Sequence, residues 1–141
     1  MKLDLSSLQK AVESLEKTIN VAENKKLAAE LDDDTKDAIK AGVIQNFEFT
    51  YELCWKFMRR WLSENATIEE AEYSRTRREL FRQAARSGLI DNPLSWFSYG
   101  DARNLTSHTY DEDKAETVYE AAIDFLEDAK DFLKRLQEHN D

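Results

Sequence analysis

The chain has 141 residues, of which 35% are charged and 41% hydrophobic, and its length predicts one domain. Three glycines and one proline stand against roughly ten and seven at average usage. This scarcity of turn-forming residues argues against a β-sandwich, a β-barrel or an enzyme built on a glycine-rich phosphate loop, and predicts an all-α protein.

The balance of charged and metal-binding side chains narrows the class further. The chain carries 29 acidic and 20 basic residues, a formal net charge of −9, which disfavours indiscriminate binding to nucleic acid or anionic membranes. One cysteine, Cys54, excludes an internal disulfide, and one cysteine with two histidines is too few for a Cys/His zinc site. No segment has the length and apolarity of a membrane span. We therefore expect a cytoplasmic protein without a metal centre or a membrane partner.

The first half of the chain predicts two long helices. Apolar residues recur at helical spacing over residues 4–29, which predicts an amphipathic helix. The run Asp32, Asp33, Asp34 and Thr35 supplies an N-terminal cap for a second helix, extending to about residue 65. Its apolar stripe is wide and rich in aromatic residues, so we expect a central helix, with Cys54 as a small buried hydrophobe.

Three further helices are predicted in the second half, after a polar connector at residues 65–73. Ser74 is the expected cap of a short helix that ends near Gly88. Asp91, Asn92 and Pro93 form a start signal for a helix running through Leu105. Residues 111–113 open the last amphipathic helix. Long helices with short joins predict an up-and-down four-helix-type bundle with one extra short helix.

Candidate chemistry concentrates in residues 101–110, DARNLTSHTY. Arg103 offers a guanidinium that can bind a phosphate group through two hydrogen bonds. His108 offers an imidazole that titrates near neutral pH and can act as general acid or base. This combination suits attack of a ribose 2′-hydroxyl on the adjacent phosphate, which is metal-independent RNA cleavage. One histidine fills only one of the two proton-transfer roles, so a two-fold dimer would supply both.

Helical geometry limits this interpretation. On an ideal helix Asn104 and His108 share one side, whereas Arg103 and His108 diverge by about 140°. They converge only if the helix loosens near His108 or a second chain contributes. In the alternative interpretation, Arg103 forms a salt bridge with Asp101 or Glu112 and His108 caps a helix end.

A second feature is a local excess of arginine. Residues 75–86 hold five arginines and one glutamate, a local net charge of +4 within an acidic chain. Spacings of 3, 4 and 4 place four arginines on one helical stripe, which could follow an RNA backbone. The alternatives are a solvated face or a docking surface for acidic residues. The stripe consists of Arg75, Arg78, Arg82 and Arg86.

Residues 103–110 resemble the Arg-x4-His-x-Tyr signature of HEPN-domain proteins, including a polar residue, Asn104, directly after the arginine. Residues 45–56 (QNFEFTYELCWK) and 82–90 (RQAARSGLI) are similar to the nucleotidyltransferase substrate-binding-protein-like family. The resemblance extends from about residue 5 to residue 135. It implies an all-α homodimer encoded beside a minimal nucleotidyltransferase.

The resemblance also implies roles for individual residues. In HEPN toxins the arginine and histidine, here Arg103 and His108, cleave RNA, including tRNA, in the dimer cleft. Asn104 would orient His108 or the phosphate. The partner nucleotidyltransferase would act as antitoxin by transferring AMP to the motif tyrosine, here Tyr110. Two alternatives stay open: a non-catalytic substrate-binding subunit of the nucleotidyltransferase, and a helical interaction module without enzymatic activity.

Overall fold

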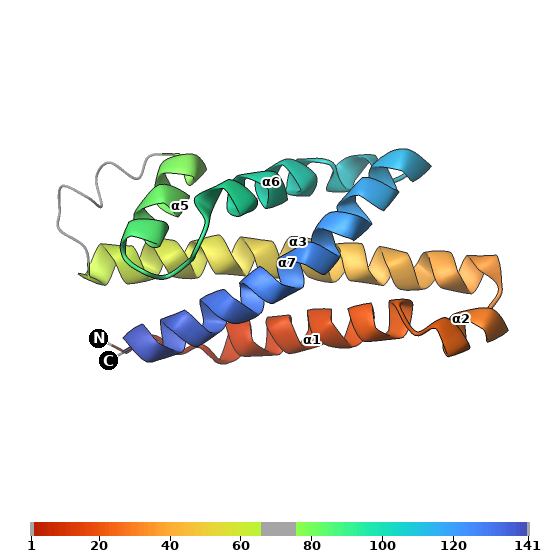
Figure 1. Ribbon diagram of the computed structural model, residues 1–141, viewed down its shortest axis with the longest axis horizontal. Coiled ribbons are helices and arrows are strands. Elements are labelled where there is room, and N and C mark those ends of the chain that lie inside the picture. The colour runs from red at the N-terminus through yellow and green to blue at the C-terminus, as the bar shows by residue number, and fades with distance from the viewer. Residues whose placement is uncertain (1, 66–75, 141) are drawn as a thin grey trace.

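The computed structural model describes residues 2–65 and 76–140, and its architecture is all-α (Figure 1). Within these ranges the chain forms six α-helices and one short 3-10 turn, and contains no strand. In chain order they are α1 (Ser6–Ala22), α2 (Lys25–Glu30), α3 (Asp33–Asn65), α5 (Arg77–Arg86), α6 (Pro93–Asn104), the turn η1 (Thr106–His108) and α7 (Glu112–His139).

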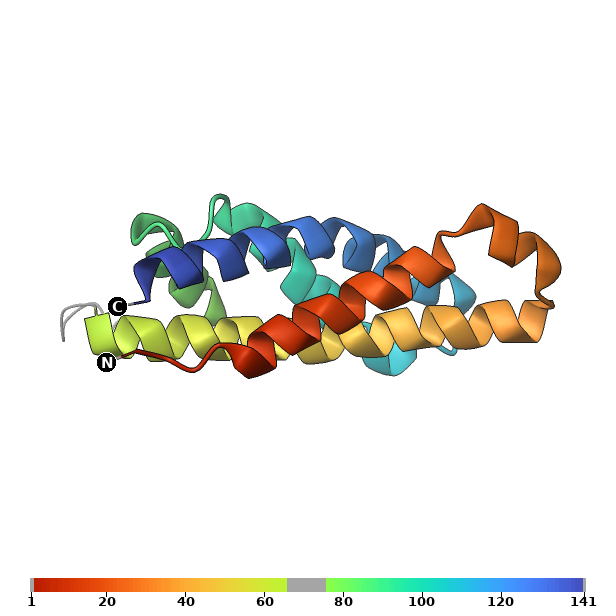
Figure 2. The same cartoon turned by 90° about the horizontal axis from the view of Figure 1, so that it is seen from below.

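Helix α3 is the centre of the bundle, as its wide apolar stripe predicted. It contacts α1, α5, α6 and α7. Figure 1 shows α5 and α6 along one side of α3, α1 along the other, and α7 crossing α3, and Figure 2 shows α1 crossing α3. The interior is one cluster of buried apolar side chains, with an aromatic centre in which many rings meet edge to face. That centre contains Phe47, Tyr51, Phe81, Trp96, Tyr99, Phe125 and Phe132.

The two ends of the chain are tied together. The amide of Leu3 donates to Asn140 Oδ1 at 2.8 Å, and Asn140 Nδ2 donates to the carbonyl of Leu3 at 2.9 Å. The N- and C-termini consequently lie side by side in Figure 1. This pair of hydrogen bonds closes the bundle at the end distant from α2.

Local capping signals predicted most helix boundaries. Asp32 accepts from the amide of Thr35 at 2.8 Å, Asn92 accepts from Leu94 at 3.0 Å beside Pro93, and Asp111 caps α7 by accepting from Asp113. Gly88 adopts φ 81° directly after α5, the left-handed conformation that glycine tolerates best. These predictions are confirmed.

Three boundaries differ from expectation. The first predicted helix ends at Ala22, because Asn24 starts α2 by accepting from the amide of Leu27. Helix α5 begins at Arg77 with Thr76 as its cap, whereas the predicted cap Ser74 and residues 66–73 of the predicted connector lie outside the described residues. Helix α6 ends at Asn104, so the prediction that it continues through Leu105 is wrong.

Cys54 is fully buried, and burial raises the pKa of its thiol, which confirms the expected small buried hydrophobe. No helix in the described ranges combines the length and the apolarity needed to cross a membrane.

Two glycines provide a matched test of this packing. A Cβ at Gly100 would lie 2.9 Å from the buried Tyr51 Oη, whereas a Cβ at Gly42 would meet nothing within 4 Å. We expect Gly100→Ala to lower the free energy of unfolding by about 1–3 kcal/mol through overpacking. Gly42→Ala should instead raise it by about 0.5–1 kcal/mol, since alanine favours helix.

Urea unfolding followed by circular dichroism measures both changes. Adding Tyr51→Phe to Gly100→Ala should restore much of the lost stability, because it removes the clashing oxygen. Equal stability of the two alanine variants would contradict the described packing of α6 on α3.

Candidate active site at the end of helix α6

The break at the end of α6 shapes the candidate site. The hydroxyl of Thr106 donates to the carbonyl of Arg103 at 2.8 Å, and the amide of His108 donates to the carbonyl of Leu105 at 2.9 Å. A threonine hydroxyl that takes a helix carbonyl competes with continued α-helix. The chain therefore turns through η1, and Asn104 and His108 do not share a helix face. The α-helix is thus interrupted between Arg103 and His108, which is the change that the two side chains would need in order to converge on one ligand.

The guanidinium of Arg103 is held between α6 and α3. Its Nε donates to Glu52 Oε1 at 3.0 Å, its Nη2 lies 3.6 Å from Glu48 Oε1, and its Nη1 donates to Thr106 Oγ1 at 3.3 Å. The alternative prediction of a salt bridge to Asp101 or Glu112 is wrong, because both carboxylate partners come from α3. About a third of the side chain stays exposed, which leaves the guanidinium accessible to a ligand.

Glu52 connects α3 to α6, and each of its two carboxylate oxygens accepts a hydrogen bond. While Oε1 accepts from Arg103, Oε2 accepts from the indole Nε1 of Trp55 at 2.8 Å. Sequence reasoning did not single out Glu48 and Glu52 as site residues. Their spacing of four within the aromatic-rich middle of the helix, which places both on one face, was the available signal.

His108 and Tyr110 project from the turn into solvent. Tyr110 is 84% exposed, and its ring lies 6.2 Å from the His108 ring, centroid to centroid, in an edge-on arrangement. Within the described residues the His108 imidazole makes no hydrogen bond, so the alternative in which it caps a helix end is wrong. The imidazole is free to meet a substrate or a second copy of the chain.

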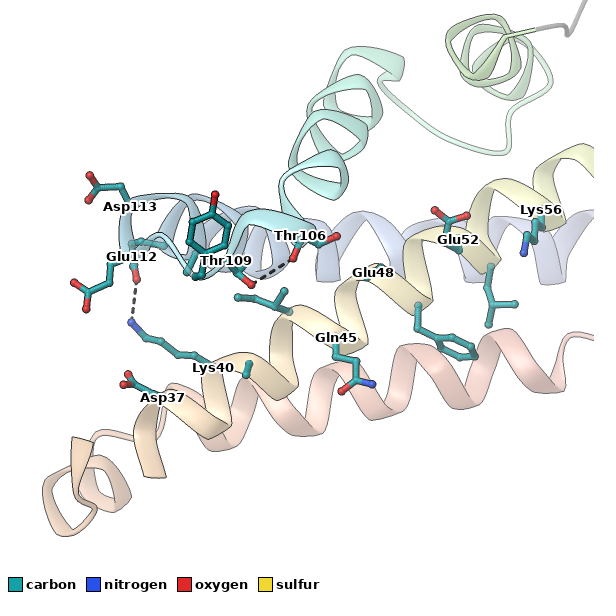
Figure 3. A pocket seen from close by; sticks show the side chains of 17 residues that line it. Asp37, Lys40, Gln45, Glu48, Glu52, Lys56, Thr106, Thr109, Glu112 and Asp113 are labelled. Atoms are coloured by element: carbon teal, nitrogen blue, oxygen red, sulfur yellow. Dashed lines mark hydrogen bonds and ion pairs between the residues drawn. The ribbon is translucent and has the colours of Figure 1, made fainter. Parts of the chain in front are cut away.

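A large open groove lies beside this turn (Figure 3). It has a volume of about 1250 Å³ and runs between α3 on one side and η1 with the start of α7 on the other. Tyr110 and the 58% exposed Phe49 line it. Acidic side chains outnumber basic ones along its walls, where Lys40 pairs with Glu116 at 2.9 Å. The charged lining residues are Asp37, Lys40, Glu48, Glu52, Lys56, Glu112, Asp113 and Glu116.

Asn104 faces a different part of the surface. It lines a small hollow of about 160 Å³ together with Arg77 and Arg78 of α5 and the buried Tyr51 of α3. The end of α6 thus separates two surfaces, because Tyr110 lines the groove and Asn104 lines the hollow. The structure does not bring Asn104 close to His108. Within one chain, the geometry therefore does not support the predicted role of Asn104 in orienting His108.

The predicted arginine stripe lies only partly on one surface. The guanidinium groups of Arg78 and Arg82 lie over the Phe97 ring at 4.8 and 5.4 Å, and Arg82 also pairs with Glu79. Arg86 is exposed in the last turn of α5, and Arg75 lies outside the described residues.

Over residues 2–65 and 76–140 no group of three His, Cys, Asp or Glu side chains is placed to hold a metal ion.

The second histidine has a structural position. His139 packs against Trp61 with ring centroids 5.9 Å apart, and its Nδ1 lies 2.7 Å from the carbonyl of Arg135. It also lies beside Gly88, next to the end of α5. These contacts at the closed end of the bundle leave His108 as the imidazole of the candidate site.

Known proteins share this sequence and fold. The family model described as nucleotidyltransferase substrate binding protein like matches residues 3–138. A Haemophilus influenzae protein named probable ribonuclease HepT is 37% identical over 139 residues, which cover 99% of this chain and 95% of that protein.

Two solved structures extend the comparison. A Haemophilus influenzae protein, described as showing the fold of a substrate binding domain of a nucleotidyltransferase, superposes with a TM-score of 0.88 at 37% identity, over 95% of this chain and 99% of the other. A Thermus thermophilus protein with 24% identity shares the fold, with a TM-score of 0.72 over 92% and 98% of the two chains. The chain described above therefore belongs to the nucleotidyltransferase substrate binding protein like family.

Proposed function

We propose that this chain is a metal-independent endoribonuclease toxin of a toxin–antitoxin pair. The observation that carries the proposal is the break after α6: Arg103 lies in the last turn of α6, and His108 and Tyr110 follow it, exposed, on the turn beyond. The probable ribonuclease HepT, which matches almost the whole chain, supports the same class of activity. RNA, with tRNA among the candidates, is the proposed substrate.

The proposed reaction needs one cation and two proton transfers. The ribose 2′-oxygen bonds to phosphorus and the bond from phosphorus to the 5′-oxygen breaks, leaving a cyclic phosphate and a 5′-hydroxyl. Arg103 stabilises the charge that develops on the phosphate oxygens. His108 either accepts the 2′-hydroxyl proton or donates a proton to the leaving 5′-oxygen.

A dimer completes this chemistry. No contact joins Arg103 and His108 within the described part of one chain, and one imidazole fills one proton-transfer role at a time. In a two-fold dimer the His108 of each copy would supply the role that the other lacks. We propose a homodimer with the two turns facing a shared cleft.

A second candidate function is supported by a separate observation, the groove beside α3. The groove beside α3, at about 1250 Å³, is larger than the roughly 300–1000 Å³ of a typical small-molecule site. The Haemophilus influenzae structure is described as showing the fold of a substrate binding domain of a nucleotidyltransferase. In this alternative the chain presents a substrate to a nucleotidyltransferase and cleaves nothing.

Replacing His108 separates the two functions. We expect His108→Ala to abolish RNA cleavage and growth inhibition, since the general acid or base is lost, while the helical circular dichroism spectrum persists. Cleavage by the wild-type chain should continue in the presence of a chelator. Unchanged cleavage by His108→Ala would reject the nuclease assignment, and a wild-type chain without nuclease activity would favour the substrate-binding alternative.

Glu52 provides a test of how Arg103 is positioned. Glu52→Ala removes the acceptor that holds Nε of Arg103, and we expect kcat/KM for RNA cleavage to fall on the order of ten- to a hundredfold through misplacement of the cation. Glu48→Ala is the matched control, because it removes the same charge one turn earlier on α3 but loses a longer contact of 3.6 Å.

The direction of the two effects distinguishes the mechanisms. If Glu52 positions Arg103, Glu52→Ala is impaired and Glu48→Ala is not. If both carboxylates merely repel RNA, both variants cleave faster than the wild type, and the positioning role is wrong.

Tyr110 is the proposed site of neutralisation by AMP transfer. Its 84% exposure leaves the phenol accessible to a modifying enzyme. Co-expression with a neighbouring minimal nucleotidyltransferase should add the mass of AMP to the peptide containing Tyr110, as mass spectrometry would detect. Tyr110→Phe should lose this addition and keep its toxicity. Addition of AMP to another residue in the wild-type chain would contradict the assignment.

A further inference from the structure

Four arginines from two helices gather on two aromatic rings beside the candidate active site. Arg59 of α3 and Arg77 of α5 lie over the Trp55 ring at 4.9 and 4.3 Å. Over the Phe97 ring of α6 lie the next two arginines of α5. We call this surface the arginine–aromatic patch, and it consists of Trp55, Arg59, Arg77, Arg78, Arg82 and Phe97.

Most of these arginines have no carboxylate partner among residues 2–65 and 76–140. Arg82 pairs with Glu79, but Arg59, Arg77 and Arg78 form no ion pair with any residue in the described ranges. This is unusual on a chain with a net charge of −9. Stacking on an aromatic ring engages the flat face of a guanidinium and leaves N–H groups at its edge for hydrogen bonding to phosphate.

The hollow next to the patch limits the size of the ligand. It is lined by Arg77, Arg78 and Asn104, with Asp101 as its one carboxylate, and measures about 160 Å³. Pockets that enclose a whole small molecule commonly reach about 300–1000 Å³. A hollow below that size is suited to one unit of a longer chain that continues across the surface.

The patch is physically joined to the proposed catalytic arginine. The Trp55 indole, which lies beneath Arg59 and Arg77, donates to Glu52, and Glu52 accepts from Arg103. Asn104, the next residue after Arg103, lines the hollow. A strand whose phosphate contacts Arg103 therefore needs to extend only past the end of α6 to meet the patch.

The negative charge of the groove favours a path for RNA across the arginine–aromatic patch instead. The groove on the other side of α6 carries more carboxylates than lysines, and these repel phosphates. Single-stranded RNA is bound elsewhere by arginines that follow its backbone beside aromatic rings. We propose that the arginine–aromatic patch binds the single-stranded RNA backbone flanking the cleaved bond, an inference that rests on the proposed nuclease function.

Binding of a fluorescent single-stranded RNA to the full-length His108→Ala chain, measured by anisotropy at several salt concentrations, tests the patch. Arg59→Ala, Arg77→Ala and Arg78→Ala, each added to His108→Ala, should weaken binding. Each should also reduce the slope of log affinity against log salt by about 0.7, the value expected for one phosphate contact on a single strand.

Arg60→Ala is the matched control. Arg60 neighbours Arg59, is exposed, and lies over a different ring, that of Phe57, at 5.3 Å. It should leave affinity and slope unchanged. Equal losses for Arg59→Ala and Arg60→Ala would overturn the patch in favour of diffuse attraction, and a chain that binds no RNA would overturn it as well. Circular dichroism confirms that each variant is folded.

Cleavage kinetics separate this inference from the function on which it rests. With a His108-containing chain, Arg77→Ala and Arg78→Ala should raise KM several-fold and keep kcat. If the wild-type chain cleaves RNA and the three patch variants bind as tightly as their parent, the patch is wrong and the nuclease stands. If RNA binds through the patch without any cleavage, the proposed nuclease is wrong, and of the inference only an RNA-binding surface stands.

Discussion

The Glu52 carboxylate is the contact on which the geometry of the site depends. Its two oxygens accept from Arg103 on α6 and from Trp55 one turn further along α3. Hydrogen bonds to a charged group are stronger than those between neutral groups, and both partners are only partly exposed. The preceding residue, Tyr51, is fully buried in the aromatic core. On α3, Tyr51 is thus anchored in the core while the next residue, Glu52, holds the proposed catalytic Arg103.

The surfaces on the two sides of α6 differ in charge. Among the charged residues that line the groove, on one side of α6, most are carboxylates; on the other side the arginine–aromatic patch presents guanidinium groups that, Arg82 apart, form no ion pair within the described ranges. A net charge of −9 averages over these two surfaces. It disfavours indiscriminate attachment to polyanions but says little about the one side on which arginines accumulate.

The parts of the fold that could be predicted from sequence are those set by neighbouring residues. Asp32, Asn92 and Asp111 cap their helices through amides two or three residues away, so the signal is local. The end of α6 was missed because the apolar period continues through Leu105, while the Thr106 hydroxyl takes the carbonyl of Arg103.

The contacts of the site could not be predicted from sequence, because they form only when helices distant along the chain pack together. Arg103 and Glu52 are 51 positions apart, and only the packing of α6 on α3 brings them together. The same holds for Arg59 and Arg77, which meet over Trp55 from different helices. A helical stripe drawn on α5 alone could not include Arg59. The motif itself was visible in the sequence because its members fall within eight consecutive residues.

The charges around Tyr110 would influence where the phosphate of an attached AMP lies. The phenol lines the groove near Glu112 and Asp113, and these carboxylates would repel the phosphate of an attached AMP. Arg103 lies at the end of α6, and the ring of His108 stands 6.2 Å from the tyrosine ring, centroid to centroid. A phosphate driven from the acidic wall toward Arg103 would compete with RNA for the same guanidinium. The acidity of the groove would then favour the blocked state as well as direct RNA to the opposite side of α6.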